Sequence, residues 1–358
     1  MKRALILTFF DEINYGAVLQ SYAMQTKLQE YYSEVNIINY QPTIMKAKKS
    51  LMNFGSFKGF LLSLFSLHVN LKRKKVFSNF IENQLSVKDL SVLQNYDEKY
   101  ENDVFLGSDQ IWNPRITGSV DPVFFGVIPT LKRRKTIAYA PSFGVNNLTE
   151  GELSGISTFL PNVDCLSVRE QEAKNLISAC TTEEIQVVCD PTLLLKADEW
   201  KDKIITPPLI DEYIFIYSLS QDAEVFKVAN HISQNLNIPI VEAYLGRRPK
   251  KSTKTHSVLY ALSPEEFLGY IYNSKYVVTD SFHGTVFSII FHKEFYCVPF
   301  KGKEGRIKDL LSRCGLSKCI VSSIESMNLD DKINYSYVDQ ALSLYREQSV
   351  QYIEESII

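Results

Sequence analysis

The 358-residue chain contains few of the residues that build metal centres or disulfide frameworks. It has only five histidines, none of them spaced as metal ligands, and six scattered cysteines without a Cys-x-x-Cys pair. We therefore expect no bound metal. We also expect the cysteines to be reduced residues of a cytoplasmic protein.

A strong charge bias is also missing. Lys and Arg number 39 and Asp and Glu number 41, which gives a formal net charge of −2. Proteins that bind nucleic acid usually carry a basic surface, so we expect no nucleic-acid partner. The N-terminal apolar run is too short for a signal peptide, and no Gly-x-Gly-x-x-Gly string is present. A secretory leader and a dinucleotide fingerprint are therefore not expected.

Short apolar runs of strand length alternate with helical patterns along the whole chain. We expect strands at 4–9, 35–39, 103–106, 135–140, 164–168, 185–189, 213–217, 238–243, 276–279 and 294–299. Such alternation is typical of parallel sheets covered by helices. The predicted fold class is therefore α/β, with two Rossmann-like lobes in a glycosyltransferase-B-like arrangement.

The prolines after Thr206 indicate a domain boundary. We expect an N-terminal domain at 1–206, a C-terminal domain at 207–334, and a final helix at 335–358 that crosses back to the first lobe. Residues 46–75 stand out within the first domain because they include eight basic residues and no acid. We expect a helical insertion there, and the alternative is a basic amphipathic element that lies on anionic lipid.

The turn at 280–283 is the strongest candidate for an active site. A buried strand runs into Asp280, Ser281, Phe282 and His283, and an apolar helical run follows. Ligands of open α/β sheets bind at the carboxyl ends of the strands, where helix N-termini favour anions. A histidine there can donate hydrogen bonds and exchange a proton near neutral pH. We expect His283 to be the centre of the site and Asp280 to brace the turn or to orient His283.

Two other strand ends carry candidate side chains. Arg169 follows its strand directly, and its guanidinium can hold a carboxylate or phosphate through two parallel hydrogen bonds. An ion pair with Glu170 or Glu172 is the alternative. Asp109 stands near Trp112, a combination common in sugar sites, where the carboxylate orients a hydroxyl or accepts its proton. An Asx turn beside a core tryptophan is the alternative.

Six strings occur along the chain in the order NYGAVLQSYA, FLGSDQIWNP, IAYAPSFG, LSVRE, CDPTLLL and TDSFHG. Together they closely resemble the polysaccharide pyruvyl transferase family, over nearly the whole chain. Members of that family look like two-lobed glycosyltransferase-B folds. They move the enolpyruvyl unit of phosphoenolpyruvate onto two hydroxyls of a sugar, giving a cyclic pyruvate ketal without a metal. The resemblance implies that His283 and Arg169 contact phosphoenolpyruvate and that the loops of the first domain face the sugar.

The expected site residues fall into three groups, with no metal ligand among them. The catalytic residues are His283 and Asp109; the donor-binding residues are Arg169, Ser281, Phe282, Gly284, Lys301 and Arg306; the acceptor-binding residues are Asn14, Tyr15, Ser108, Trp112, Ser142 and Phe143.

The resemblance also bears on cofactors and partners. It implies phosphoenolpyruvate as co-substrate, no further cofactor, and a lipid-linked or nucleotide-linked sugar of a cell-surface polysaccharide precursor as acceptor. The protein would act in the cytoplasm, at the inner face of the membrane if residues 46–75 touch lipid. Two alternatives stay open: a glycosyltransferase that uses a nucleotide sugar, and a non-catalytic glycan-binding protein on the same scaffold.

Overall fold

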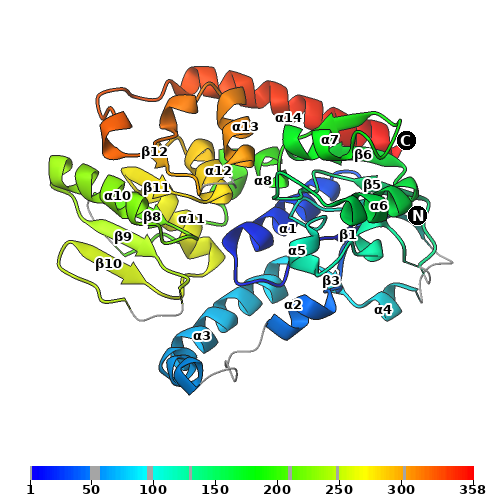
Figure 1. The fold of residues 1–358 in the computed structure, drawn as a ribbon, viewed down its shortest axis with the longest axis horizontal. Coiled ribbons are helices and arrows are strands. Elements are labelled where there is room, and N and C mark those ends of the chain that lie inside the picture. The colour runs from blue at the N-terminus through cyan, green and yellow to red at the C-terminus, as the bar shows by residue number, and fades with distance from the viewer. Residues whose placement is uncertain are drawn as a thin grey trace. The chain divides into compact units, whose positions relative to one another are not determined.

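The computed structural model describes residues 2–48, 57–94, 100–128, 131–208, 212–246, 250–300 and 304–358, with backbone alone at 46–48 and 57–66. The chain divides into two compact units. Unit 1 comprises Met1–Lys49, Ile81–Leu195 and Leu342–Ile358, and unit 2 comprises Ser50–Phe80 and Lys196–Ala341. Each unit contains one parallel sheet, which confirms the predicted α/β class (Figure 1).

The sheet of unit 1 has seven parallel strands. They are β1 (Lys2–Leu7), β2 (Glu34–Ile38), β3 (Val87–Lys88), β4 (Glu101–Leu106), β5 (Lys135–Ala138), β6 (Cys165–Val168) and β7 (Ile185–Val187). Their spatial order is β3-β2-β1-β4-β5-β6-β7, so the direction of winding reverses between β1 and β4. The central strands β1 and β4 are buried at every residue but the first, as expected where helices cover both faces of a sheet.

The helices of unit 1 begin at recognisable capping residues. Asn14 caps the first helix by accepting a hydrogen bond from the Gly16 N–H at 2.9 Å, and Thr149 forms a capping box with Glu152. The helices are α1 (Tyr15–Leu28), α2 (Thr43–Lys48), α4 (Leu90–Gln94), α5 (Pro114–Thr117), α6 (Glu150–Phe159), α7 (Gln171–Ile177) and α8 (Pro191–Leu194), with 3₁₀ turns η1 (Pro122–Phe125) and η2 (Leu160–Asn162).

The C-terminal helix α14 (Tyr335–Ile357) begins in unit 2, and its residues from Leu342 onward belong to unit 1, as the predicted crossing requires. Within unit 1 the Tyr352 hydroxyl donates to the Ala138 carbonyl oxygen at 2.9 Å. The Lys2 ammonium donates to the Ile357 carbonyl oxygen at 3.2 Å, so the two ends of the chain lie close together (Figure 1).

The sheet of unit 2 has five parallel strands. They are β8 (Ile214–Tyr217), β9 (Ile240–Ala243), β10 (His256–Leu259), β11 (Tyr276–Thr279) and β12 (Glu294–Cys297). The order β10-β9-β8-β11-β12 reverses between β8 and β11. The helices are α9 (Ala197–Lys201), α10 (Ala223–Leu236), α11 (Pro264–Asn273), α12 (Phe282–Ile290) and α13 (Gly305–Arg313), with 3₁₀ turns η3 (Ser317–Cys319) and η4 (Ile324–Ser326).

Helix α3 (Phe57–Gln84) contributes its residues up to Phe80 to unit 2. It covers most of the predicted insertion at 46–75, while 49–56 lie outside the described residues. The buried Arg73 donates to main-chain carbonyl oxygens in two loops of unit 2. These are the oxygens of Tyr244 at 2.6 Å, Leu245 at 3.2 Å, Gly246 at 3.1 Å and Tyr260 at 2.5 Å. Of the helices in the described ranges, none combines the length and hydropathy needed to span a bilayer.

Candidate active site

Arg169 lies at the end of β6 and is held by carboxylates. Its side chain is almost fully buried, Nη1 donates to Asp190 Oδ2 at 2.8 Å, and Nε lies 3.6 Å from Glu170 Oε2. Burial acts to lower the pKa of Arg169, but the charges of Asp190, Glu170 and Asp109 outweigh it and raise the pKa. The guanidinium therefore stays charged. An ion pair with Glu170 was the alternative to ligand binding that the sequence offered for Arg169. The hydrogen bond with Asp190 was not indicated by the sequence.

The network around Arg169 continues to the reversal of the sheet in unit 1. The Ser108 hydroxyl donates to Asp190 Oδ2 at 3.2 Å and lies at the same distance from Gln20 Oε1. Gln20 Nε2 donates to Thr8 Oγ1 at 3.0 Å. Buried polar side chains from the ends of β1, β4, β6 and β7 are thereby joined, at the edge where parallel sheets bind ligands.

Ser142 joins the same network from the end of β5. Its hydroxyl donates to Glu170 Oε1 at 2.8 Å. Two residues earlier Ala140 has φ of +54°, a conformation that is costly for a residue with a Cβ. Strained backbone of this kind is concentrated at functional sites, which supports a role for this edge of the sheet.

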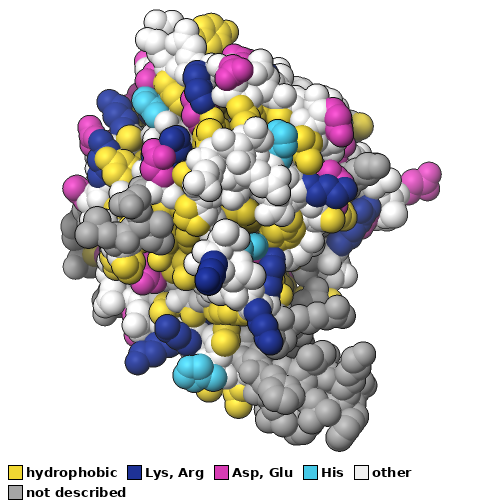
Figure 2. Space-filling model, turned by 90° about the vertical axis from the view of Figure 1, so that its left-hand side faces the viewer, with side chains coloured by type: hydrophobic (Ala, Val, Ile, Leu, Met, Phe, Trp, Pro, Cys, Tyr) yellow, Lys and Arg dark blue, Asp and Glu magenta, His cyan; other side chains and the backbone are white. Residues whose placement is uncertain are grey.

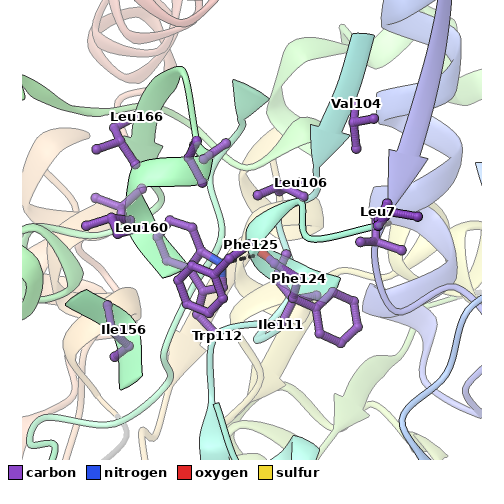
Figure 3. Packing of buried hydrophobic residues seen from close by; sticks show 14 of the residues in the cluster. Leu7, Val104, Leu106, Ile111, Trp112, Phe124, Phe125, Ile156, Leu160 and Leu166 are labelled. Atoms are coloured by element: carbon purple, nitrogen blue, oxygen red, sulfur yellow. Dashed lines mark hydrogen bonds between the residues drawn. The ribbon is translucent and has the colours of Figure 1, made fainter. Parts of the chain in front are cut away.

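Trp112 lies in the hydrophobic core of unit 1, which was the alternative to a role in sugar binding. Its ring stacks on Phe125 with centroids 5.1 Å apart, and Nε1 donates to the Phe124 carbonyl oxygen at 2.8 Å (Figure 3). The indole is 2% exposed, so its face is not presented to a sugar and the predicted stacking role needs correction. Asp109 Oδ1 accepts a hydrogen bond from the Gln110 N–H at 2.7 Å, and Phe143 is buried beside Trp112.

The remaining acceptor candidates in unit 1 lie at the start of α1. Asn14 caps the helix and Tyr15 is buried. Their side chains have structural tasks here, and their contact with an acceptor stays a prediction.

Unit 2 brings five of the predicted donor and catalytic residues together. Ser281 caps α12, and His283 lies in the first turn of that helix, directly after β11. The rings of Phe282 and His283 are perpendicular with centroids 5.2 Å apart, and Arg306 Cζ of α13 lies 5.8 Å from the Phe282 ring centroid. Lys301 lies outside the described residues.

Gly284 allows α12 to start against the end of β11. A Cβ at this position would lie 2.3 Å from Thr279 Oγ1. That oxygen is fixed in place, because it donates to the Tyr217 carbonyl oxygen at 2.6 Å and accepts from the Ser281 N–H at 3.0 Å. The glycine therefore sets the close approach that places His283 at the sheet edge.

Asp280 links its turn to a second loop of unit 2. Its carboxylate accepts hydrogen bonds from Ser218, Leu219 and Ser220, which belong to the loop after β8. These hydrogen bonds fix the turn of Asp280 against a second loop, and the orientation of His283 by Asp280 stays a prediction.

A second buried carboxylate in unit 2, Glu242 of β9, was not singled out by the sequence. It accepts hydrogen bonds from Lys250 Nζ at 2.7 Å and His256 Nε2 at 2.9 Å. Burial acts to raise the pKa of Glu242, but the hydrogen bonds from His256 and Lys250 outweigh it, and the pKa is lowered. Within the described residues no group of three or more His, Cys, Asp or Glu side chains is arranged to hold a metal ion.

Comparison with known proteins identifies one family and one fold. A family model described as polysaccharide pyruvyl transferase matches residues 14–301, and no curated protein matches the sequence. A UDP-N-acetylglucosamine 2-epimerase structure is similar with a TM-score of 0.52 and 11% identity, covering 99% of this chain and 95% of that chain. The structure of S. aureus MnaA with UDP has a TM-score of 0.50 and 12% identity, covering 99% of this chain and 91% of that chain. At these identities the likeness concerns the fold alone, and it confirms the glycosyltransferase-B-like class.

Proposed function

This chain belongs to the polysaccharide pyruvyl transferase family, and we propose that it transfers the enolpyruvyl group of phosphoenolpyruvate to a sugar of a cell-surface polysaccharide precursor. The observation that carries this proposal is the position of His283. It lies in the first turn of α12, directly after β11, where the strand order of unit 2 reverses. A proton-transfer group and a helix N-terminus thus lie at an edge suited to an anion.

The reaction consumes two sugar hydroxyls and releases phosphate. Protonation of the methylene carbon of phosphoenolpyruvate creates an oxocarbenium-like centre at the neighbouring carbon. One hydroxyl oxygen bonds to that carbon, the carbon–oxygen bond to phosphate breaks, and the second hydroxyl closes the ketal. The two hydroxyl groups lose two protons in total. One makes up for the proton added to the methylene carbon, which becomes a methyl group, and the other leaves with phosphate.

We assign the donor to the residues around His283. The positive end of α12 and the half-buried Arg306 offset the charge of phosphoenolpyruvate, while His283 moves a proton. Such proton transfer typically contributes about 10²–10⁴-fold to the rate. Arg169 stays a proposed contact of phosphoenolpyruvate. The carboxylate of phosphoenolpyruvate would compete with Glu170 for the guanidinium of Arg169.

The acceptor is assigned to unit 1, where the charges of Asp190, Glu170 and Asp109 all act on the buried guanidinium of Arg169. Carboxylates suit the hydroxyl groups of a sugar, because they can accept hydrogen bonds and protons from them. Asp109 is half-buried, and we propose it as the group that orients the acceptor hydroxyl or accepts its proton.

The acceptor is further proposed to be presented at a membrane surface. Leu71 of α3 is 48% exposed and Lys72, Lys74 and Lys75 are exposed beside it. Lysines near an anionic surface contribute roughly 1 kcal/mol each. In the upper part of the face seen in Figure 2, by contrast, acidic and basic side chains are interspersed. Co-sedimentation with phosphatidylserine vesicles, lost in the variant Lys72→Glu/Lys75→Glu, tests this; equal binding to phosphatidylcholine alone contradicts it.

Thermal unfolding with phosphoenolpyruvate, UDP and inorganic phosphate tests the proposed donor. A ligand at 100 times its dissociation constant stabilises by about 2.7 kcal/mol. That corresponds to a rise in Tm of roughly 5–10 °C for units of this size. We expect this rise with phosphoenolpyruvate and its loss in His283→Asn and Arg169→Ala.

His292→Asn is the matched control. His292 lies just beyond the other end of α12, is exposed, and has φ of +53°, which asparagine tolerates. It should respond to phosphoenolpyruvate as the unaltered protein does. A rise with UDP and none with phosphoenolpyruvate would favour a nucleotide-sugar glycosyltransferase instead.

A further inference from the structure

Two loops leave the sheet of unit 2 where its strand order reverses. One is the turn of His283, which follows β11. The other is the β8–α10 loop, Ser218–Asp222, which follows β8. Ligands of open α/β sheets bind at such a reversal, between the loops of the two strands that flank it. The sequence drew attention to the first loop alone.

The carboxylate of Asp280 joins these two loops. Oδ1 accepts a hydrogen bond from the Leu219 N–H at 2.7 Å. Oδ2 accepts from the Ser218 hydroxyl at 2.7 Å, from the Ser220 N–H at 3.0 Å and from the Ser220 hydroxyl. The next residue along the chain, Ser281, is the cap of α12. One side chain therefore ties the β8–α10 loop to the start of the helix that carries His283.

The β8–α10 loop is held in an unfavourable conformation. Gln221 has φ of +56°, and its side chain donates to the Ser218 carbonyl oxygen at 3.1 Å. Leu219 is 52% exposed although its N–H is fixed by Asp280. A strained residue persists only where its surroundings determine it, and such residues are concentrated at ligand sites.

We propose that Asp280 is a positioning residue that holds the β8–α10 loop against the turn of His283, so that the loop forms a second wall of the phosphoenolpyruvate site. The inference rests on the proposed function for the identity of the ligand. The coupling between loop and turn rests on the hydrogen bonds of Asp280.

The substitution Asp280→Asn breaks this link with little change in shape. An amide accepts through its oxygen alone, so its NH₂ group would face the N–H of Leu219 or of Ser220. Asp222→Asn is the matched control from the same loop. Asp222 caps α10 by accepting from the Glu224 N–H at 2.9 Å, and asparagine caps equally well.

Two measurements on the full chain decide the proposal. The first is the NMR signal of the His283 ring, assigned among the five histidines by its loss in His283→Asn. The second is the dissociation constant of phosphoenolpyruvate from calorimetry. We expect Asp280→Asn to move or broaden the His283 signal and to weaken binding about tenfold or more, because small displacements of positioning groups carry large penalties. Asp222→Asn should do neither.

An unmoved His283 signal in Asp280→Asn, with unchanged affinity, would overturn the proposal. If the unaltered protein does not bind phosphoenolpyruvate, the proposed function fails, and the His283 signal alone then decides the coupling. If Asp280→Asn does not fold, the double variant Ser218→Ala/Ser220→Ala removes two of the four hydrogen-bond donors and takes its place.

Discussion

Removal of the charge of Asp190 should destabilise unit 1 without disturbing the start of α8. The two carboxylate oxygens of Asp190 make different interactions. Oδ1 caps α8 by accepting from the Thr192 N–H at 3.0 Å, and Oδ2 accepts from Arg169 at 2.8 Å. Asp190→Asn preserves the cap, since asparagine is an equally good capping residue. It leaves the buried guanidinium with one carboxylate fewer.

The expected magnitude follows from the burial of the pair. Both side chains are at most 2% exposed, and breaking a buried ion pair by removing one partner costs about 3–5 kcal/mol. Glu170 lies 3.6 Å from Arg169 and offsets part of this loss, so we expect about 3 kcal/mol. The corresponding fall in the Tm of unit 1 is roughly 6–12 °C.

A double-mutant cycle tests the explanation and not only the size of the effect. Arg169→Met removes the other partner, and in the double variant no buried charge of this pair is left uncompensated. The loss of stability in the double variant should therefore be smaller than the sum of the losses in the two single variants, by about 1–3 kcal/mol. Asp222→Asn, at the N-cap of α10, should change the Tm little, because asparagine caps equally well. Effects of Asp190→Asn and Arg169→Met that add to within about 0.5 kcal/mol would refute a direct interaction.

Two further predictions concern unit 2. The pKa of Glu242 is lowered in the fold, so its contribution to stability is present above its unfolded pKa and is lost as the pH falls through the folded value. Glu242→Gln should therefore destabilise most at neutral pH and least below about pH 4 in urea unfolding; a penalty independent of pH would contradict this. Gly284→Ala should cost about 1–3 kcal/mol, because the new Cβ would lie 2.3 Å from Thr279 Oγ1. Gly151→Ala, with nothing within 4 Å of its Cβ, should be neutral or stabilise slightly, as thermal unfolding would show.

The sequence predicted those elements whose signals are local. The apolar run predicted as a strand at 276–279 is β11, with bounds identical to those observed. Two strands were missed. β3 has only two residues, and β10 is an edge strand whose short run includes the polar residues His256 and Ser257. A short edge strand buries little apolar surface and therefore leaves a weak pattern.

The partners within the site could not be predicted in the same way. The turn of His283 was identified because strand, turn and helix follow one another along the chain. Asp280, however, bonds to Leu219, 61 positions earlier, and Arg169 to Asp190, 21 positions later. These pairs meet only because the parallel strands β8 and β11, and β6 and β7, are neighbours. Strand order therefore has to be known before such partners can be named.

The division of the chain has a consequence for its biosynthesis. The sequence passes from unit 1 to unit 2 and back twice, and α14 supplies the last part of unit 1. On the ribosome, Ala138 emerges well before Tyr352, whose hydroxyl bonds to its carbonyl oxygen. Unit 1 can thus complete its packing only after all of unit 2 has been translated. Unit 2 likewise depends on Arg73, far upstream, to pair the carbonyl groups of its loops. If the chain is cut into two contiguous fragments, each fragment should therefore lack part of its unit. Unit 2, whose last segment ends at Ala341, can be fully assembled before unit 1.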